Sequence, residues 1–284
     1  MASQRDIRRR IGAVRNIRQI TRAMQFVAAS KLKRAQGATL ASRPYATKLD
    51  EVLADLAAVL DADQHPLLAR YEGTKRLIVL ITTDRGLAGP LNTNTIRFAM
   101  KEIVEHAGEI TLVTVGRKGR DAMRRVRLPI EAHFAAYGDR PSFADVTPLA
   151  RLVTDDYLAG TYGAIDLVYP HFVSTLVQRP TLEQLLPIRA STDTGGVPGN
   201  QFIFEPSPDA VLREILPRYV ATRVFQAVLE TTASEMSSKM VAMKNATDNA
   251  EDLIEDLTLS YNKVRQANIT REMIEIASGA RSRA

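Results

Sequence analysis

The feature that most constrains this fold is a run of 61 residues, Arg218 to Ser278, that contains neither proline nor glycine. These two residues most readily break or weaken a helix interior, so nothing in the run opposes one continuous helix. At about 1.5 Å per residue the helix would be roughly 90 Å long, far longer than a globular domain needs. Its apolar or small residues recur at alternating steps of four and three: Met236, Met240, Met243, Thr247, Ala250, Ile254, Leu257, Tyr261 and Val264. This heptad seam predicts a partner helix.

The N-terminal stretch predicts that partner. Its apolar residues keep helical spacing: Ile7, Ile11, Val14, Ile17, Ile20, Met24, Val27 and Ala28. We expect Pro44 to kink or briefly break the helix before the pattern resumes up to a turn at His65-Pro66. Residues 1–48 hold twelve basic residues and one acidic residue, a net charge of +11, whereas residues 230–276 hold five and nine, a net charge of −4. Complementary charge and complementary stripes together predict an antiparallel coiled coil of the two terminal helices.

The middle of the chain has the pattern of an α/β domain. Apolar, β-rich runs predict strands at Leu77–Thr83, at Glu109–Val115, and at Ile165–Tyr169 followed by His171–Thr175. Helical patterns fall around Thr93–His106, Lys118–Arg125 and Phe143–Leu158. This alternation predicts a parallel or mixed, Rossmann-like sheet.

The segment that returns to the terminal helix predicts a loop, a strand and a helix cap. We interpret Thr192–Asn200 as a loop or hairpin tip and Gln201–Phe204 as a short strand. Ser207, between two prolines, is expected to cap the final helix. The expected division is therefore a helix over 1–66, an α/β domain over 67–206 and a helix over 207–284.

Composition excludes several classes of function. With 45% apolar residues the chain of 284 residues can bury a core, and it shows neither the apolar stretch of a membrane span nor a secretory signal. The absence of cysteine excludes disulfides, thiolate metal sites and cysteine nucleophiles, and the four histidines are widely scattered. We therefore predict neither a metal nor a cofactor.

The best candidate for a ligand site is the loop after the first strand, which includes Asp84, Arg85, Gly86 and Gly89. Open α/β sheets usually bind ligands at this position. The loop lacks both the G-x-G-x-x-G spacing and the G-K-[ST] ending of nucleotide-binding loops. The plainer interpretation is a tight turn with an Asp–Arg pair and both glycines at positive φ, or a loop that contacts a protein.

Other patterns have equally plain interpretations. The basic turn Gly116–Arg120 could contact phosphate at a helix N-terminus, but a solvated turn is the simpler interpretation. The acidic block Glu251–Asp256 fits the flank of a seam better than a catalytic pair, and the methionines of the terminal run fit a core better than a cofactor site.

The basic N-terminal helix raises nucleic-acid binding as an alternative function. Binders of RNA and single-stranded DNA usually interleave aromatic residues for stacking, and residues 1–48 offer only Phe26 and Tyr45. A protein that binds duplex phosphates needs no aromatics, so a basic coiled-coil nucleic-acid-binding protein stays open as an alternative.

Both termini resemble those of the γ subunits of F-type ATP synthases. The N-terminal resemblance covers Ile11–Met24 (IGAVRNIRQITRAM) and Val27–Lys33 (VAASKLK). The C-terminal resemblance covers Met240–Asn249 (MVAMKNATDN) and Leu257–Thr270 (LTLSYNKVRQANIT), and Thr83–Leu87 (TDRGL) is similar to the family's central loop. The motifs follow the family's order along the whole chain.

The resemblance implies a rotor subunit that performs no chemistry and binds no cofactor. In that family the paired terminal helices form a shaft inside the α3β3 ring, and the α/β domain meets the ε subunit and the membrane c-ring. Turning the asymmetric shaft cycles the catalytic β subunits through their states. The implied partners are α3β3, ε and the c-ring, with no nucleic acid and with the membrane reached only through the complex. Ala88 replaces the family's usual cysteine, and the chloroplast insertion and a transit peptide are missing. This implies a peripheral protein on the cytoplasmic face of a bacterial plasma membrane.

The resemblance also implies contact residues on the shaft. Thr21, Arg22, Met24 and Gln25 match the stretch that faces an acidic loop of the β subunits, and the cationic face with Arg8 and Arg9 gives that contact a charge rationale. Lys239 stands where the family often has arginine, and Arg271 where it commonly has glutamine, in the region that grips a β-subunit loop. Both substitutions keep a cation and a hydrogen-bond donor.

Overall fold

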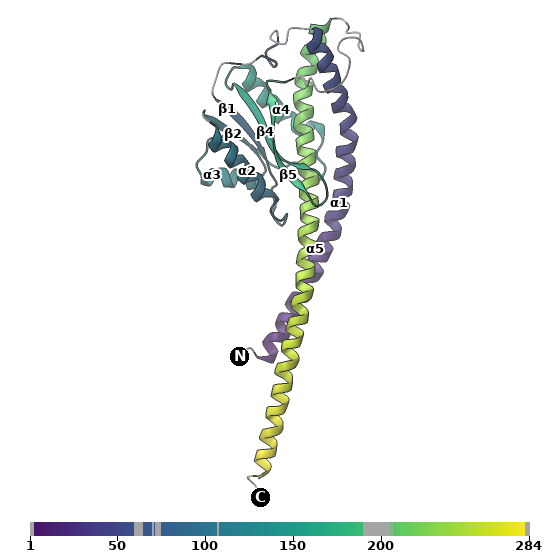
Figure 1. Cartoon of the computed structure of the whole chain (residues 1–284), viewed down its shortest axis with the longest axis vertical. Coiled ribbons are helices and arrows are strands. Elements are labelled where there is room, and N and C mark those ends of the chain that lie inside the picture. Colours follow the sequence, from purple (N-terminus) through teal and green to yellow (C-terminus); the bar gives the residue numbers. More distant parts are fainter. Residues whose placement is uncertain are drawn as a thin grey trace. The chain divides into compact units, whose positions relative to one another are not determined.

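The computed structural model describes residues 3–59, 65–69, 71, 75–106, 108–189, 205 and 207–281. The chain begins and ends with a very long helix, and the segment between these two helices forms a five-stranded α/β structure (Figure 1). The elements in chain order are α1 (Gln4–Val59), β1 (Arg76–Ile81), α2 (Leu91–Glu105), β2 (Ile110–Val115), α3 (Arg117–Arg125), β3 (Ile130–Phe134), α4 (Phe143–Leu158), β4 (Ala164–Phe172), β5 (Gln178–Leu186) and α5 (Pro208–Arg281). The chain divides into two compact units, which we call the shaft unit (Met1–Ala28 with Met240–Ala284) and the α/β unit (Ala29–Lys239).

Helix α5 confirms the prediction of one continuous helix and extends it to 74 residues. It begins ten residues before the proline- and glycine-free run and includes Pro217. At its N-terminus the Ser207 hydroxyl accepts a hydrogen bond of 3.2 Å from the backbone N–H of Ala210. Ser207 therefore caps the helix as predicted, with Pro208 at the first helical position.

Helix α1 runs through Pro44, so of the two predicted alternatives, a kink or a brief break, the break is wrong. Pro44 cannot donate a backbone hydrogen bond, which leaves the carbonyl one turn earlier without its helical partner. Because Pro44 lies on the exposed side of the helix, water can reach that carbonyl. The opposite side is held by buried residues before and after the proline, namely Thr39, Ala46 and Leu49, and this packing continues the helix.

In the shaft unit α1 and α5 pack together in antiparallel orientation. Arg18 Nη1 lies 3.0 Å from Glu251 Oε1, and the Thr21 and Thr247 hydroxyls are 2.8 Å apart. Higher residue numbers in α1 thus meet lower numbers in α5, as the complementary charges predicted. On the facing sides Ile7, Ile11, Met243 and Ala250 are buried. Other residues of the predicted stripe and seam are half-buried, namely Val14, Met24, Met240, Ile254, Leu257, Tyr261 and Val264.

The sheet of the α/β unit has the order β3-β2-β1-β4-β5. The first four strands are parallel, and β5 runs antiparallel to β4, so of the predicted alternatives, a parallel or a mixed sheet, the mixed sheet is confirmed. The sequence pattern did not predict two of the strands, β3 and β5. The two short runs expected near residue 170 join in the single strand β4, which continues through Pro170 but ends at Phe172, so the part of the second run from Val173 to Thr175 is not a strand.

Helices cover both faces of this sheet and give three layers (Figure 1). In β1 the side chains of Leu77, Val79 and Ile81 face α4 and the parts of α1 and α5 that belong to the α/β unit. Ile78 and Leu80 face the opposite layer, formed by α2 and α3. Burial on both faces explains why β1 is continuously apolar rather than alternating. The loop and strand predicted at Thr192–Asn200 and Gln201–Phe204 lie outside the described residues.

Candidate functional site: the loop after β1, the cavity beside it and the shaft surface

The loop after β1, residues 82–92, is closed by side-chain hydrogen bonds between its ends. Asn92 Oδ1 accepts from the backbone N–H of Thr83 at 3.2 Å, and Asn92 Nδ2 donates to Thr83 Oγ1 at 2.9 Å. Gly89 has a φ of 51°, as predicted, but the other residue with positive φ is Leu87 at 64° and not Gly86. Leu87 therefore holds a conformation that L-residues rarely adopt, and its side chain is exposed.

Asp84 does not form the predicted pair with Arg85. Its Oδ1 accepts a hydrogen bond of 2.9 Å from the backbone N–H of Arg117, the first residue of α3, and lies 3.9 Å from Arg117 Nε. A carboxylate at this position satisfies a free N–H group and interacts favourably with the helix dipole. The position where a phosphate would bind at α3 is therefore already occupied by a side chain of the protein itself.

The glycines before and within α3 allow close packing and do not form a phosphate cradle. A Cβ at Gly116, whose φ is 88°, would lie 2.3 Å from the carbonyl oxygen of Thr82. A Cβ at Gly119 would lie 2.9 Å from Thr82 Oγ1, the atom to which the Gly119 N–H donates. The glycine spacing thus lets the first turn of α3 approach the end of β1.

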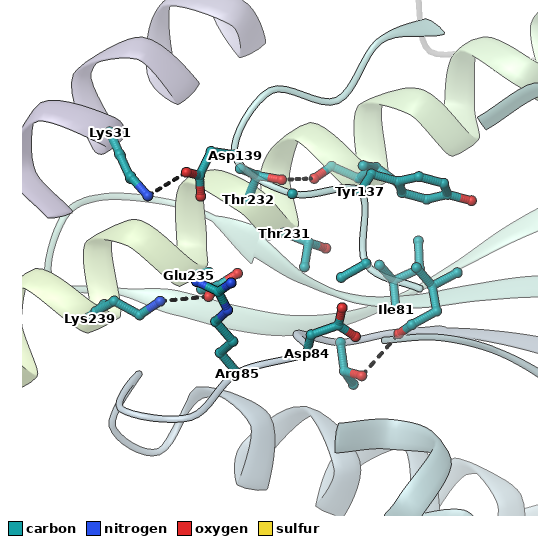
Figure 2. A pocket seen from close by; sticks show the side chains of 15 residues that line it. Lys31, Ile81, Asp84, Arg85, Tyr137, Asp139, Thr231, Thr232, Glu235 and Lys239 are labelled. Carbon is teal, nitrogen blue, oxygen red and sulfur yellow. Dashed lines mark hydrogen bonds and ion pairs between the residues drawn. The ribbon is translucent and has the colours of Figure 1, made fainter. Parts of the chain in front are cut away.

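A cavity of about 310 Å³ lies at the carboxyl ends of β1 and β2, with α5 as one wall (Figure 2). Six charged residues line it, and the charges balance: Lys31, Arg85 and Lys239 against Asp84, Asp139 and Glu235. Lys31 forms an ion pair with Asp139, and Lys239 Nζ lies 2.8 Å from Glu235 Oε1. With Asp84 capping α3, every one of these carboxylates already has a partner inside the protein. The cavity therefore offers little to a charged ligand.

The uncharged polar groups around the cavity are likewise engaged or turned away. Thr231 and Thr232 donate to the carbonyl oxygens of Ala227 and Val228 in their own helix, at 2.7 and 2.9 Å. The Tyr137 ring points away from the centre of the cavity in Figure 2, and burial raises the pKa of its hydroxyl to about 12. Among the described residues there is no group of three or more histidine, aspartate or glutamate side chains that could hold a metal ion. We find no arrangement here that performs chemistry.

The shaft unit exposes large apolar side chains on both helices. In α1, Ile17, Ile20 and Val27 are each more than half exposed, although their spacing assigned them to the coiled-coil stripe. The side chains that face α5 in this stretch are Arg18 and Thr21 instead. Near the end of α5 the exposed apolar residues are Ile269, Met273, Ile274 and Ile276. A strict heptad pattern could have predicted which side chains face α5. It continues from Ile11 and Val14 to Thr21 and leaves out Ile17 and Ile20.

Comparison with known proteins identifies the family of the chain. A protein-family model described as ATP synthase matches residues 3–282. The ATP synthase gamma chain of Moorella thermoacetica is 47% identical over 283 residues, which cover 99% of both chains. That of Desulfitobacterium hafniense is 48% identical over 280 residues, again 99% of both. The chain belongs to the ATP synthase gamma chain family. It is accordingly a non-catalytic subunit, the central-stalk rotor of F1, as the terminal motifs implied.

Two solved structures share the fold of this chain. A chain of the Euglena gracilis mitochondrial ATP synthase, solved with OSCP, F1 and c-ring, aligns with a TM-score of 0.70 and 23% identity. The alignment covers 98% of this chain and 94% of that one. A chain from the central stalk and c-ring of the Tetrahymena thermophila enzyme gives a TM-score of 0.60 at 24% identity, over 80% and 99% of the two chains.

The predicted contact residues of this gamma chain lie in different settings. Arg8, Arg9, Arg22 and Arg271 are exposed in the shaft unit, whereas Met24 and Gln25 are half-buried. Thr21 bonds to Thr247 across the helix pair. Lys239 belongs to the α/β unit, where its side chain is only 16% exposed and is paired with Glu235. The structure thus leaves four of these side chains fully available to a partner. In the part of the chain that the structure describes, no helix is long and apolar enough to cross a membrane.

Proposed function

We propose that this gamma chain turns inside the α3β3 ring with its shaft unit and meets the ε subunit and the c-ring through its α/β unit. The membrane is then reached only through the complex, at the cytoplasmic face of a bacterial plasma membrane. Because the shaft is asymmetric, each orientation makes different contacts with the three β subunits and biases them toward different states. The chain supplies these differential contacts and no catalytic group.

The exposed apolar end of α5 is the observation that carries this proposal. Extending the antiparallel register from Thr21–Thr247 puts the start of α1 opposite about residue 265 of α5. The last turns of α5 therefore extend past the first residue of α1. Ile269, Met273, Ile274 and Ile276 lie on these turns, between 46% and 74% exposed. Apolar side chains gathered on an unpaired helix indicate a surface that another protein covers, as a surrounding ring would.

The test is a pull-down of the tagged chain from detergent-solubilised membranes, with mass spectrometry of the proteins recovered. We expect α, β, ε and c subunits at nearly fixed stoichiometry, and an untagged strain treated in parallel as the control should yield none of them. Recovery of nucleic acid without ATPase subunits would contradict the proposal and favour the nucleic-acid-binding alternative.

The cationic face of α1 leads to a prediction about assembly. Arg8, Arg9 and Arg22 are exposed, so replacing all three by glutamate should leave the fold intact while reversing the charge that meets the acidic β-subunit loops. We expect association with α3β3 to slow about tenfold or more at low ionic strength, with a smaller effect at high salt. Stopped-flow mixing with α3β3 at several salt concentrations measures this.

A matched control carries the same charge change outside the shaft. Lys118, Arg124 and Arg125 are exposed on α3, and their triple glutamate variant should associate with α3β3 like the unmodified chain. Equal rates for both variants would mean that the cationic face of α1 is only solvated surface.

The purified chain alone should neither hydrolyse ATP nor bind it tightly. The space near the end of β1 is filled by Thr82 and the N-terminus of α3 is capped by Asp84, so a triphosphate has no cradle there. Phosphate release and equilibrium dialysis with labelled ATP measure turnover and binding. Robust, saturable turnover would assign a catalytic role to the loop at residues 84–89.

A further inference from the structure

The sheet has a topological switch point between β1 and β4. Helices α2 and α3 cover one face and α4 covers the other, so the winding of the chain reverses between these two strands. Open α/β sheets usually bind their ligands in the crevice at the carboxyl ends of such strands. In this protein a segment of α5 that belongs to the same compact unit contacts the chain on both sides of this position.

Three serines of α5 donate hydrogen bonds at this crevice, where Glu230 of α5 also pairs with His171 of β4. Ser238 Oγ donates to the carbonyl oxygen of Ala88, in the loop after β1, at 2.6 Å. Ser234 Oγ donates to the carbonyl oxygen of Pro170, in β4, at 2.9 Å. Ser237 Oγ donates at 2.5 Å to the carbonyl oxygen of Thr175, in the turn between β4 and β5. The three hydroxyls thus tie one helix face to both sides of the switch point, and all three serines are buried.

These hydroxyls differ from those of three threonines in the same helix. A serine or threonine within a helix commonly donates to the carbonyl one turn earlier. Thr222, Thr231 and Thr232 of α5 do so, with distances of 2.7 to 2.9 Å to the carbonyls of Arg218, Ala227 and Val228. Ser234, Ser237 and Ser238 donate instead to backbone of the α/β segment. The β4–β5 turn is held from its other side too, because Gln178 Nε2 donates to Ser237 Oγ at 3.3 Å and to the Thr175 carbonyl at 3.1 Å.

We infer that Ser234, Ser237 and Ser238 form the joint through which torque passes between the α/β domain and α5. Eight α5 residues between Leu212 and Val228 pack into the core on the face of the sheet that α4 covers, and this hydrophobic contact is not directional. Hydrogen bonds are directional, and breaking a buried one leaves a carbonyl that water cannot reach. The position that binds a ligand in other α/β folds serves here to fix α5 on the sheet. The inference rests on the proposed rotor function in the assembled complex.

The test replaces the three serines by alanine in the complete ATP synthase, in inverted membrane vesicles. We expect ATP hydrolysis to continue while the protons pumped per ATP fall at least about twofold, because two buried hydrogen bonds and one part-buried hydrogen bond that resist sliding are lost. The matched control is the triple valine variant of Thr222, Thr231 and Thr232, which also removes three hydroxyls from α5 but only bonds within the helix. It should pump like the unmodified enzyme.

A second measurement separates a joint from a purely structural role. The chain has no cysteine, so a cysteine at exposed Arg124 can carry a bead on the α/β domain while α3β3 is fixed to a surface. The angular variance of the bead during pauses reports torsional stiffness, and we expect it to rise at least about twofold in the serine variant and not in the threonine variant. If the triple serine variant does not assemble, the single variants Ser237→Ala and Ser238→Ala are measured in the same way.

The outcomes distinguish this inference from the proposed function. Unchanged pumping and unchanged angular variance in the serine variants, with normal rotation of the unmodified complex, would overturn the joint alone. Equal loss in the serine and threonine variants would also overturn it, since any buried hydroxyl of α5 would then matter equally. Failure of the unmodified chain to assemble with α3β3 would instead overturn the rotor proposal.

Discussion

ATP synthesis should fall to background in a complex that carries Ile254→Pro. Ile254 is half-buried on the side of α5 that faces α1. Proline there removes a backbone hydrogen bond and forces its ring against the preceding turn, at a cost of about 3 kcal/mol or more in a helix interior. The helix must then bend away from α1, which opens the seam. Pro44 is tolerated because it lies on an exposed side, where a bend does not separate the pair.

The measurement is ATP synthesis in energised vesicles, with subunit composition checked by gel. Ile254→Ala is the control, because alanine keeps the helix and removes only part of one half-buried side chain. We expect it to retain most of the activity. Assembled complexes with Ile254→Pro that made ATP at the normal rate would show that the paired shaft is not needed for coupling.

Asp166→Ala should destabilise the α/β unit by about 3 kcal/mol, because removing one partner of a buried ion pair leaves the other charge uncompensated. Asp166 lies in β4 with a fully buried side chain and pairs with Arg76 at the start of β1. Burial raises the pKa of the Asp166 carboxyl, and the positive charge of Arg76 opposes this rise. The loss of stability therefore comes mainly from the guanidinium of Arg76, which keeps its charge but loses its partner.

Urea unfolding followed by tyrosine fluorescence measures this effect. The chain has no tryptophan, and six of its eight tyrosines lie between residues 67 and 219. The double variant Arg76→Leu with Asp166→Leu should recover most of the loss, since apolar replacement of a whole buried pair is often neutral. Glu105→Ala breaks the exposed pair with Lys101 and should cost at most about 0.5 kcal/mol. If Asp166→Ala lowered the free energy of unfolding by as little as Glu105→Ala, a structural role for the buried pair would be contradicted.

The strands show how far local pattern predicts this fold. β1 and β2 are buried on both faces and have continuous apolar sequences, so both were predicted. β3 (IEAHF) and β5 (QRPTLEQLL) lie at the two edges of the sheet and carry charged or polar residues. Their pairing partners hold them in the sheet, and propensity alone does not indicate them. The same tertiary support carries β4 through Pro170.

In the candidate site too, the sequence predicted some features and only the structure showed others. The position of the loop after β1 was predicted, but the partner of Asp84 is Arg117, 33 residues away, and not the adjacent Arg85. Likewise Gly116 and Gly119 stand out in the sequence, although only the structure shows that Thr82 fills the space beside them. Sequence patterns identify residues with unusual backbone or charge, whereas the partner of each residue depends on how distant segments meet.

The amino-acid sequence by itself determined the two long helices, their antiparallel pairing, the mixed α/β domain between them and, through the terminal motifs, the family. These properties depend on local periodicity, on the absence of helix breakers and on net charge, all of which can be counted along the chain. The tertiary structure alone decided which apolar side chains of the shaft stay exposed, which carboxylate caps α3 and where the serines of α5 donate. Each of these depends on a contact between residues far apart in sequence, and such a contact is set by the packing of whole elements.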